Sequence, residues 1–485
     1  MAPTAGAGAG ATVSSWIPPT LPDCEGYDGE VLLDMKCYIA DLPNATAAMA
    51  ATSTGLPLQV SFHAARPPLL SHFCLHCPGL DFPLSAPKVV ATDAGLVLLR
   101  VPVNPTNHTV TIRSSDYFLY RPRARQLFLL PSPQSDSIAD SATALLSIGG
   151  GGAGGSFAVA AIGNWGPVFD RSGRTLLRWV FDLYLYRSSS SSSFSGGRWT
   201  TRRMSVKDLV RDSAIPLPDS VVRLYHQTGR AFTVGGARGT VAWVDLWRGI
   251  LLIDVTTSHP RPVLRDVPLP VPARGNWGLL GEGRNPGYIR DVAISRRRYC
   301  IKYVEMEIQP SRVVRTLPDS YHEWVRGGSR RSHVIPGSWK ATTWSMAAVP
   351  GRGGSSWTDW KIECEVESKD VAGGGGLLSK LSGRATLPEV PVAYPTLSAD
   401  DDTVYLLSST KRRGEMVVAV DLRNKTLRGA AKLDAQKTFC SMPTYCASDI
   451  CRYLTKGTAG TREEHKRTEV RVRQRQQLMT SRPTR

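Results

Sequence analysis

The sequence predicts a mainly β protein in which antiparallel hairpins are arranged as in a β-propeller. Its apolar segments are short, rich in Val, Leu, Tyr, Phe and Trp, and interrupted by Gly, Pro, Asp and Ser, which is typical of strands and turns. Units of strand, turn and strand recur along the chain, and many short strands joined by hairpins favour a propeller over a single sandwich. With 485 residues, of which 42% are hydrophobic, the chain is long enough to bury a large core.

The clearest hairpin is predicted for residues 239–255, where two apolar runs flank a turn from Asp245 to Gly249. Asp accepts hydrogen bonds from the backbone that follows it, and Gly adopts positive φ without strain, so both residues favour a turn. Residues 116–131 read as strand, Pro-marked turn and strand, similar to the blades of F-box-associated propellers. The turns are unevenly spaced along the chain, so the number of blades stays open. The same pattern predicts further hairpins at 89–101, 168–180, 403–422 and 417–427.

Composition divides the chain into a single domain and two terminal segments. Residues 1–16 are rich in Ala and Gly and are expected to form a disordered N-terminus, whereas residues 17–455 carry the strand pattern of the one propeller-like domain. Residues 456–485 contain nine Lys or Arg against three Glu and few apolar side chains, which predicts a basic tail that is disordered or forms a frayed helix. Low-complexity stretches are expected to form flexible surface loops at Gly149–Gly155, Ser188–Ser193 and Gly373–Gly376.

Five segments carry a resemblance to a known family, and the first two are Asn44-Ala-Thr and Ser53-Thr-Gly-Leu-Pro. The other three are the run Ser71-His-Phe-Cys-Leu-His-Cys-Pro78, the run from Trp243 to Asp254, which reads Trp-Val-Asp-Leu-Trp-Arg-Gly-Ile-Leu-Leu-Ile-Asp, and Arg290-Asp-Val-Ala293. In these segments the chain resembles plant proteins of the domain-of-unknown-function 1618 (DUF1618) family, from about Leu32 to about Tyr445. The resemblance implies a propeller-like fold akin to F-box-associated domains. It implies no reaction and no catalytic residue, because the family has none assigned.

Charge and cysteine usage limit the compartment and the partners. The formal net charge of +18 favours an anionic partner such as RNA, although part of it lies in the basic tail and no RNA-binding or DNA-binding motif accompanies it. The nine scattered cysteines are typical of reduced thiols, and the sequence shows no secretory leader and no apolar run long enough for a bilayer. We therefore expect an intracellular protein, in the cytoplasm or nucleus, without a membrane partner.

The run His72-Phe-Cys-Leu-His-Cys77 contains four side chains that could bind a soft metal, which makes Cys74 and Cys77 the candidate metal ligands. On a strand, however, His72, Cys74 and His76 would share one face at spacings of roughly 6.5 to 7 Å while Cys77 faces the other side. A zinc ion needs all its ligands about 2 Å from one point. We expect buried structural thiols here, with no bound metal or other cofactor.

No motif of a catalytic site is found. The sequence contains neither a G-x-S-x-G nor an H-E-x-x-H motif, and Asp400–Asp402 before an apolar run is interpreted as a solvated turn, so no catalytic residue is assigned. Tryptophans in strands usually pack between sheets, and this is expected for most of the twelve. Trp247 is the exception: it lies in the predicted turn at 245–249, where we expect an exposed tip. Trp247 and its neighbour Arg248 are therefore the candidate residues for contacting a partner.

The function favoured by these observations is a non-enzymatic protein–protein interaction module, in which a rigid scaffold presents its loops. The alternative is an RNA-binding or polyanion-binding protein that uses basic surface clusters at Arg121/Arg123/Arg125, Arg296–Arg298, Arg330/Arg331 and Lys411–Arg413. The third possibility is an enzyme whose catalytic residues come from separate loops and leave no linear motif. The sequence identifies neither the partner nor the biological process.

Overall fold

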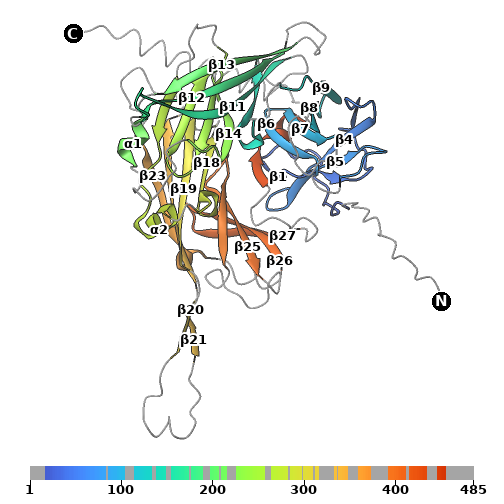
Figure 1. Cartoon of the computed structure of the whole chain (residues 1–485). Helices are drawn as coiled ribbons and strands as arrows, with labels where there is room; N and C mark the ends of the chain where they lie inside the picture. Colours follow the sequence, from blue (N-terminus) through green and yellow to red (C-terminus); the bar gives the residue numbers. More distant parts are fainter. Residues whose placement is uncertain are drawn as a thin grey trace, which may run out of the picture.

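A computed structural model gives the architecture of the chain (Figure 1). The structure describes residues 17–454, with the exception of the following residues and segments: 83–85, 104–113, 134–137, 149–154, 174–175, 189–196, 207–208, 216–225, 237, 257–263, 282–283, 296, 298, 310–311, 316–331, 336, 348–358, 373–390, 411–413 and 434–444. The predicted disordered N-terminus, the basic tail and most of the predicted flexible loops therefore lie outside the described residues.

Six sheets of four or more strands make up most of the described residues and form the blades of a propeller. Blade 1 contains β1 (Val31–Asp34), β2 (Tyr38–Ile39), β3 (Ala48–Ala51), β4 (Pro57–His63), β5 (Leu70–His76) and β28 (Tyr445–Ser448). Blade 2 contains β6 (Lys88–Asp93), β7 (Leu96–Pro102), β8 (Ser115–Arg121) and β9 (Gln126–Leu130). Blade 3 contains β10 (Thr143–Ile148), β11 (Ser156–Phe169), β12 (Leu176–Arg187) and β13 (Arg198–Val206).

The second half of the chain builds the remaining three blades. Blade 4 contains β14 (Arg230–Gly235), β15 (Thr240–Asp245), β16 (Gly249–Asp254) and β17 (Leu264–Pro268). Blade 5 contains β18 (Arg290–Ser295), β19 (Cys300–Gln309), β22 (Ser338–Ala347) and β23 (Lys361–Glu367). Blade 6 contains β24 (Val392–Leu397), β25 (Thr403–Thr410), β26 (Gly414–Asp421) and β27 (Thr426–Lys432). The six-bladed β-propeller confirms the predicted fold class and supplies the blade count that the sequence left open.

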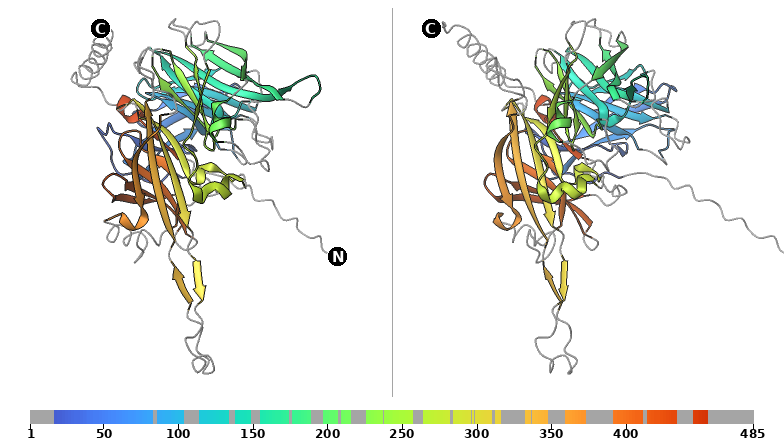
Figure 2. Two further views of the ribbon diagram at one scale, coloured as in Figure 1. Left: turned by 90° about the vertical axis from the view of Figure 1, so that its left-hand side faces the viewer. Right: turned by 60° about the vertical axis from the view of Figure 1, so that its left-hand side comes forward.

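Short helical turns and one additional hairpin lie between or beyond these strands. The hairpin of β20 (Arg312–Arg315) and β21 (Ser332–Ile335) connects β19 to β22 and projects from the body of the molecule (Figures 1 and 2). None of the helices in the described segments is long and apolar enough to cross a membrane. The helices are α1 (Val210–Ala214) and α2 (Trp277–Gly281), with single turns η2 (Asp140–Ala142), η4 (Arg274–Asn276), η5 (Pro286–Tyr288), η6 (Ser368–Asp370) and η9 (Ile450–Tyr453).

The hairpins predicted from the sequence are confirmed by the strand register. Asp93 pairs with Leu96, Asp245 with Gly249 and Thr410 with Gly414, which places the turns of the hairpins at 89–101, 239–255 and 403–422. The hairpins at 116–131, 168–180 and 417–427 are β8–β9, β11–β12 and β26–β27. All of these pairs are antiparallel, as expected for a chain of consecutive short strands.

For the turn at 245–249, the structure confirms one of the two predicted causes and corrects the other. Asp245 Oδ1 accepts the backbone N–H of Trp247 at 3.0 Å, as expected for an Asp that starts a turn. Gly249, by contrast, is not among the glycines with positive φ. A Cβ atom at this position would lie 2.6 Å from the carbonyl oxygen of Val267, so glycine is required here because a neighbouring strand approaches closely.

Strands with both faces buried explain the continuous apolar runs of the sequence. Each of the six apolar clusters in the described residues lies between two neighbouring blades. In β15, for example, Val241 and Trp243 face blade 3 whereas Ala242 and Val244 face blade 5. Because successive side chains of a strand point to opposite faces, a strand between two blades must be apolar at every position.

The first and last strands of the propeller share a blade and close the ring. β28 pairs antiparallel with β1, from Val31 opposite Ser448 to Asp34 opposite Tyr445. β1 also pairs parallel with β5, so the C-terminal strand forms the inner edge of a blade that the N-terminal segment builds. Because strands from both ends of the chain share blade 1, this blade links the end of the ring to its beginning.

Polar contacts between the inner strands fasten the blades to one another. The inner strands are β28, β6, β10, β14, β18 and β24. Each contacts the next around the ring, and β28 contacts β6 through the hydroxyl groups of Ser448 and Thr92. These contacts provide hydrogen-bond partners for polar groups that are buried between the blades. They are the hydroxyl pair Thr92–Ser448 (3.1 Å), Ser147 N–H to Asp93 (2.6 Å), Thr233 to Leu145 O (2.5 Å), Arg230 to Asp291 (3.0 Å) and Leu397 N–H to Asp291 (2.9 Å).

Candidate functional site

The two candidate metal ligands are buried. Cys74 lies in β5 and Cys77 directly after it, and their side chains are 1% and 5% exposed. Burial raises the pKa of the Cys77 thiol, which disfavours the thiolate that a metal would bind. The prediction of buried thiols is confirmed. In the described part of the chain, no three His, Cys, Asp or Glu side chains are grouped as a metal site would require.

Purified protein is accordingly expected to carry no stoichiometric zinc, because Cys74 and Cys77 pack as small apolar groups. Replacing either cysteine with serine should leave the metal content, measured by elemental analysis, at the background level of the wild type. Stoichiometric zinc that disappears in Cys74→Ser or Cys77→Ser would contradict this expectation.

The prediction that Trp247 lies at an exposed turn tip is wrong. Trp247 and Arg248 are only 6% and 4% exposed. The indole N–H of Trp247 donates to the carbonyl oxygen of Arg284 at 2.9 Å, and Arg248 forms an ion pair with Asp212 of α1. The turn is buried because Arg284 and Arg290 contact Trp247 and Asp212 of α1 contacts Arg248. Neither residue is available as an exposed anchor for a partner.

Arg290 connects two segments singled out in the sequence, Trp243–Asp254 and Arg290–Ala293. Its fully buried guanidinium donates to the carbonyl oxygens of Leu246 and Trp247, at 3.0 and 3.1 Å, and to Glu305 at 2.8 Å. The guanidinium also lies 4.6 Å from the centre of the Trp247 indole, a cation–π arrangement. The turn after β15 is thus held by the first residue of β18, which gives the Trp243–Asp254 and Arg290–Ala293 segments a shared structural role.

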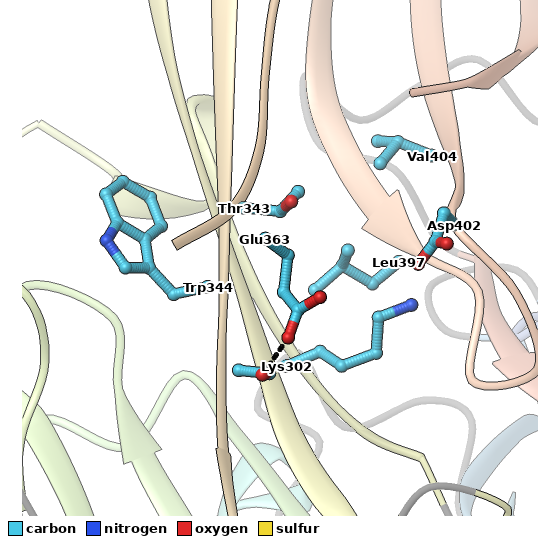
Figure 3. Close-up of a pocket in the computed structure, with 8 residues that line it drawn as sticks. Lys302, Thr343, Trp344, Glu363, Leu397, Asp402 and Val404 are labelled. Atoms are coloured by element: carbon cyan, nitrogen blue, oxygen red, sulfur yellow. Dashed lines mark hydrogen bonds between the residues drawn. The ribbon is translucent and has the colours of Figure 1, made fainter. Parts of the chain in front are cut away.

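A small hollow lies where blade 5 meets blade 6 (Figure 3). Its polar groups already have partners within the protein: Glu363 accepts the hydroxyl of Ser345 at 2.5 Å, and the ammonium of Lys302 donates to the carbonyl oxygen of Ser398 at 2.9 Å. The hollow is lined by Lys302, Thr343, Trp344, Ser345, Glu363, Leu397, Asp402 and Val404.

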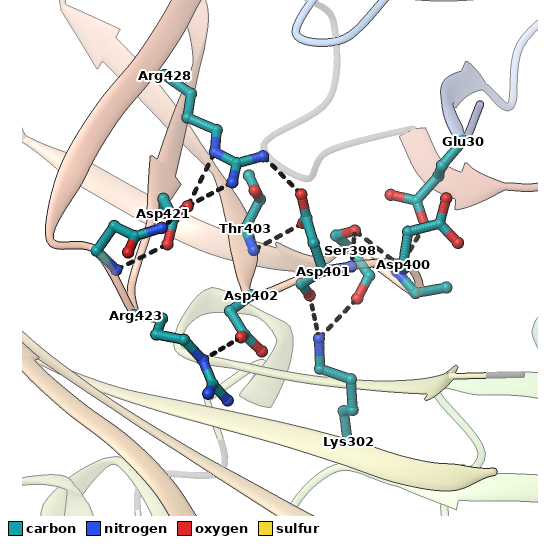
Figure 4. Close-up of polar contacts among 12 residues, drawn as sticks. Glu30, Lys302, Ser398, Asp400, Asp401, Asp402, Thr403, Asp421, Arg423 and Arg428 are labelled. Carbon is teal, nitrogen blue, oxygen red and sulfur yellow. Dashed lines mark hydrogen bonds and ion pairs between the residues drawn. The ribbon is translucent and has the colours of Figure 1, made fainter. Parts of the chain in front are cut away.

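The acidic turn Asp400–Asp402 lies beside this hollow and is a cross-link between blades (Figure 4). Lys302 of blade 5 donates to the backbone oxygen of Asp401 at 2.5 Å, so the turn is bound to the neighbouring blade. The interpretation as a simple solvated turn therefore needs correction, because every carboxylate of the turn has a cationic partner. The pairs are Asp400 with Arg452, Asp401 with Arg428 (2.6 Å) and Asp402 with Arg423 (2.6 Å).

Glu30 completes this junction between the two ends of the chain. Its Oε2 accepts the backbone N–H of Ala399 at 2.5 Å, whereas its Oε1 is buried without a hydrogen-bond partner. The side chain is only 5% exposed, and Figure 4 shows its carboxylate beside that of Asp400. Burial, and secondly the charge of Asp400, raise the pKa of Glu30 to about 7. The charge at the ring-closure junction therefore changes near neutral pH.

Exposed apolar side chains, missed by reasoning from the sequence, lie in the described part of the segment from 269 to 289. Val271 is 63% and Trp277 57% exposed, and Tyr288 at the end of the same segment is 41% exposed. The indole N–H of Trp277 donates to the carbonyl oxygen of Pro272 at 2.9 Å, which holds the ring against its own segment. A signal was present: Trp277 stands in the run Arg-Gly-Asn-Trp-Gly, outside any apolar strand.

Comparison with known proteins finds a family-model match over part of the chain and no activity. No curated protein matches the chain. Two solved structures show weak similarity. Apo AztD from Citrobacter koseri is 9% identical with a TM-score of 0.30, and the match covers 83% of this chain and 89% of that one. The Aleuria aurantia lectin, a fungal lectin with a six-bladed β-propeller fold, is 9% identical with a TM-score of 0.28, and the match covers 85% of this chain and 97% of that one. Residues 243–405 match the family model described as protein of unknown function (DUF1618).

Proposed function

We propose that this protein is a non-enzymatic protein-interaction module located inside the cell, in which a rigid six-bladed propeller presents the segment between blades 4 and 5 to a protein partner. The observation that carries the proposal is Trp277, a large aromatic side chain that is 57% exposed although its polar N–H is already hydrogen-bonded within the protein. An exposed tryptophan whose orientation is fixed is the type of side chain that dominates protein interfaces.

The backbone beneath Trp277 supports this proposal because it is firmly held. The side-chain amide of Asn276 donates to Glu305 at 2.8 Å and to the carbonyl oxygen of Met306 at 2.9 Å, and Asn276 is itself buried. A surface that is ordered before binding loses less conformational entropy when the partner arrives. The segment thus has the properties of a preformed docking site.

Binding of RNA or another polyanion remains the second candidate. Of the basic clusters named above, the described residues include only Arg121, Arg123, Arg125 and Arg297. Arg121 is 3% exposed and donates to the carbonyl oxygen of Gly155, so it is not part of a basic surface. Arg123 and Arg125 are exposed at the turn of blade 2. Their contribution to binding would weaken steeply as salt rises.

Affinity capture from an extract of the source organism tests the proposed function. Wild-type protein should retain specific partner proteins at moderate salt, and Trp277→Ala should reduce the affinity for them about thirtyfold, the effect of losing a central aromatic anchor. The melting temperature should stay within about 2 °C of the wild type because the side chain is mostly exposed.

Ile362→Ala is the matched control, because Ile362 is 62% exposed on the outer strand β23 of blade 5. It should capture the same partners as the wild type. The proposal fails if Trp277→Ala and the wild type retain the same proteins in equal amounts, or if the retained material is RNA that a salt wash removes.

A further inference from the structure

The outer strand of blade 3 carries the sequence of a protein-kinase substrate. Residues 202–206 read Arg-Arg-Met-Ser-Val, and nowhere else in the chain do two arginines stand three and two residues before a Ser or Thr. Protein kinases select their substrates by charge patterns, and arginine-directed kinases bind the cations at these two positions. They also accept an apolar residue directly after the hydroxyl, which Val206 supplies. Ser205 is therefore the candidate acceptor of a phosphoryl group.

Ser205 is exposed near the end of an edge strand. Among the described residues, β13 pairs with β12 on one side and with no strand on the other, and it lies at the edge of the molecule (Figure 1). The strand ends at Val206, which is only 6% exposed because it contacts the apolar cluster between blades 3 and 4. A kinase that binds Val206 must separate the last residues of β13 from β12. Local opening of this kind costs less free energy at the end of an edge strand than in the core.

The face of blade 3 that carries Ser205 also carries two arginines. The residues directly before and after Ser205 contact the apolar cluster, so Ser205 and Arg203 point to the opposite face. Ser205 lies opposite Val180 of β12, which places Arg178 on the same face and diagonal to Ser205. Diagonal neighbours in a sheet are within reach of a side chain as long as arginine. Both arginines are exposed, and the side chain of Arg203 is 70% exposed.

These arginines leave positive charge for an added anion. The carboxylate of Asp182, opposite Arg203, accepts Nε and Nη2 of Arg203 at 3.0 and 3.4 Å, and it also accepts the side-chain amide of Asn164 at 3.0 Å. A guanidinium has five N–H donors, so Arg203 can keep this contact and still donate to a second anion. In the part of the chain that the structure describes, no carboxylate forms an ion pair with Arg178.

We propose that Ser205 is a phosphorylation site for an arginine-directed protein kinase and that its phosphate binds between Arg178 and Arg203, linking β12 to the end of β13. The kinase transfers the γ-phosphoryl group of ATP to Oγ of Ser205. The bond between the γ-phosphorus and the oxygen that bridges it to the β-phosphate breaks, ADP leaves, and the hydroxyl proton passes to the catalytic carboxylate of the kinase. The new group carries about −1.5 to −2 charges at pH 7, which two arginines can bind. This modification is independent of the interaction function proposed above.

Phosphorylation of the folded full-length protein tests the acceptor. With ATP and the catalytic subunit of the cyclic-AMP-dependent protein kinase, mass spectrometry should locate a phosphoryl group on Ser205. Arg202→Gln should slow this transfer about tenfold or more, because the kinase loses a charge-assisted contact. Ser172→Ala, which removes an exposed serine that follows a single arginine, should be phosphorylated on Ser205 like the wild type. The assignment is overturned if Ser205 of the folded protein stays unmodified, whether or not a synthetic peptide of residues 198–210 is phosphorylated.

Phosphorus NMR of the phosphorylated protein tests where the phosphate lies. Arginines stabilise the dianion, so the second pKa of the phosphate should lie about 0.5 below its value in the phosphorylated peptide of residues 198–210, which lacks Arg178. Arg178→Gln should return this pKa to the peptide value. Arg198→Gln, at an exposed arginine on the other face of β13, should leave it unchanged. Equal pKa values for protein and peptide, or for Arg178→Gln and wild type, would overturn the proposed position of the phosphate.

Discussion

Replacing Arg290 with methionine should lower the free energy of unfolding by about 3–5 kcal/mol, the range for breaking a buried ion pair by removing one partner. Arg290 is fully buried, and Glu305 opposite it is only 2% exposed. The substitution leaves the Glu305 carboxylate without its cation and removes the donor that two carbonyl oxygens of the 246–247 turn share. Urea unfolding followed by tryptophan fluorescence gives the difference in stability.

Two further variants distinguish the destabilisation caused by an unpaired buried charge from that caused by lost packing. The double variant Arg290→Met/Glu305→Met should be more stable than Arg290→Met alone, because no unpaired charge remains buried. Arg274→Met, at an exposed arginine of the adjacent segment, should change the stability by less than about 0.5 kcal/mol. A change below about 1 kcal/mol for Arg290→Met would mean that Arg290 does not hold blades 4 and 5 together in the way the contacts indicate.

Replacing Glu30 with glutamine should remove a dependence of stability on pH. In the unfolded chain this carboxyl has a pKa near 4.5, and burial beside Asp400 raises it to about 7 in the folded protein. A raised folded-state pKa means that the folded protein holds the proton more tightly. The contribution of Glu30 to stability is thus fully present below pH 4.5 and is lost as the pH rises through 7. The difference between the two values corresponds to roughly 3 kcal/mol.

Glutamine remains neutral and still offers an oxygen to the N–H of Ala399. Glu30→Gln should therefore have nearly the stability of the wild type at pH 5 and exceed it by roughly 2–3 kcal/mol at pH 8, measured as urea midpoints at several pH values. Glu365→Gln, at a carboxylate that is 50% exposed, is the control and should follow the wild-type profile. Equal pH profiles for Glu30→Gln and the wild type would contradict the proton-binding role of Glu30. The ionisable groups that interact with Glu30 include Asp400 and Asp401 of the acidic turn and the cation Arg230. They also include Tyr27, Tyr405 and Cys446.

The hairpins could be predicted from the sequence because their signals are local. An Asp in the turn and apolar strands on both sides are sufficient for β15–β16, and these signals do not depend on the rest of the fold. Cys74 and Cys77 were placed correctly as buried thiols for a similar reason, since alternation along a strand argues against a shared metal.

Contacts between distant parts of the chain could not be predicted. Trp247 has the local sequence of an exposed turn, but Arg284 and Arg290, some forty residues later, bury it. Glu30 owes its raised pKa to burial and to the charge of Asp400, which the ring closure brings beside it. A single sequence contains no signal for such pairings. Trp277 was missed for a different reason: its setting among Gly and Asn does indicate an exposed loop, but only the fold shows which neighbours share its surface.

The closed ring is the claim on which the stability predictions and the docking surface both depend, and an engineered disulfide tests it most directly. Leu33 of β1 lies opposite the native Cys446 of β28, and both side chains contact the same apolar cluster. Opposite residues in antiparallel strands have Cα separations of about 4.5–5.5 Å, which suits a disulfide. After mild oxidation of Leu33→Cys, mass spectrometry should find residues 33 and 446 linked within one chain, with no link in Leu33→Cys/Cys446→Ser. A folded Leu33→Cys protein in which these residues stay unlinked, or link only between two chains, would contradict the closed six-bladed ring.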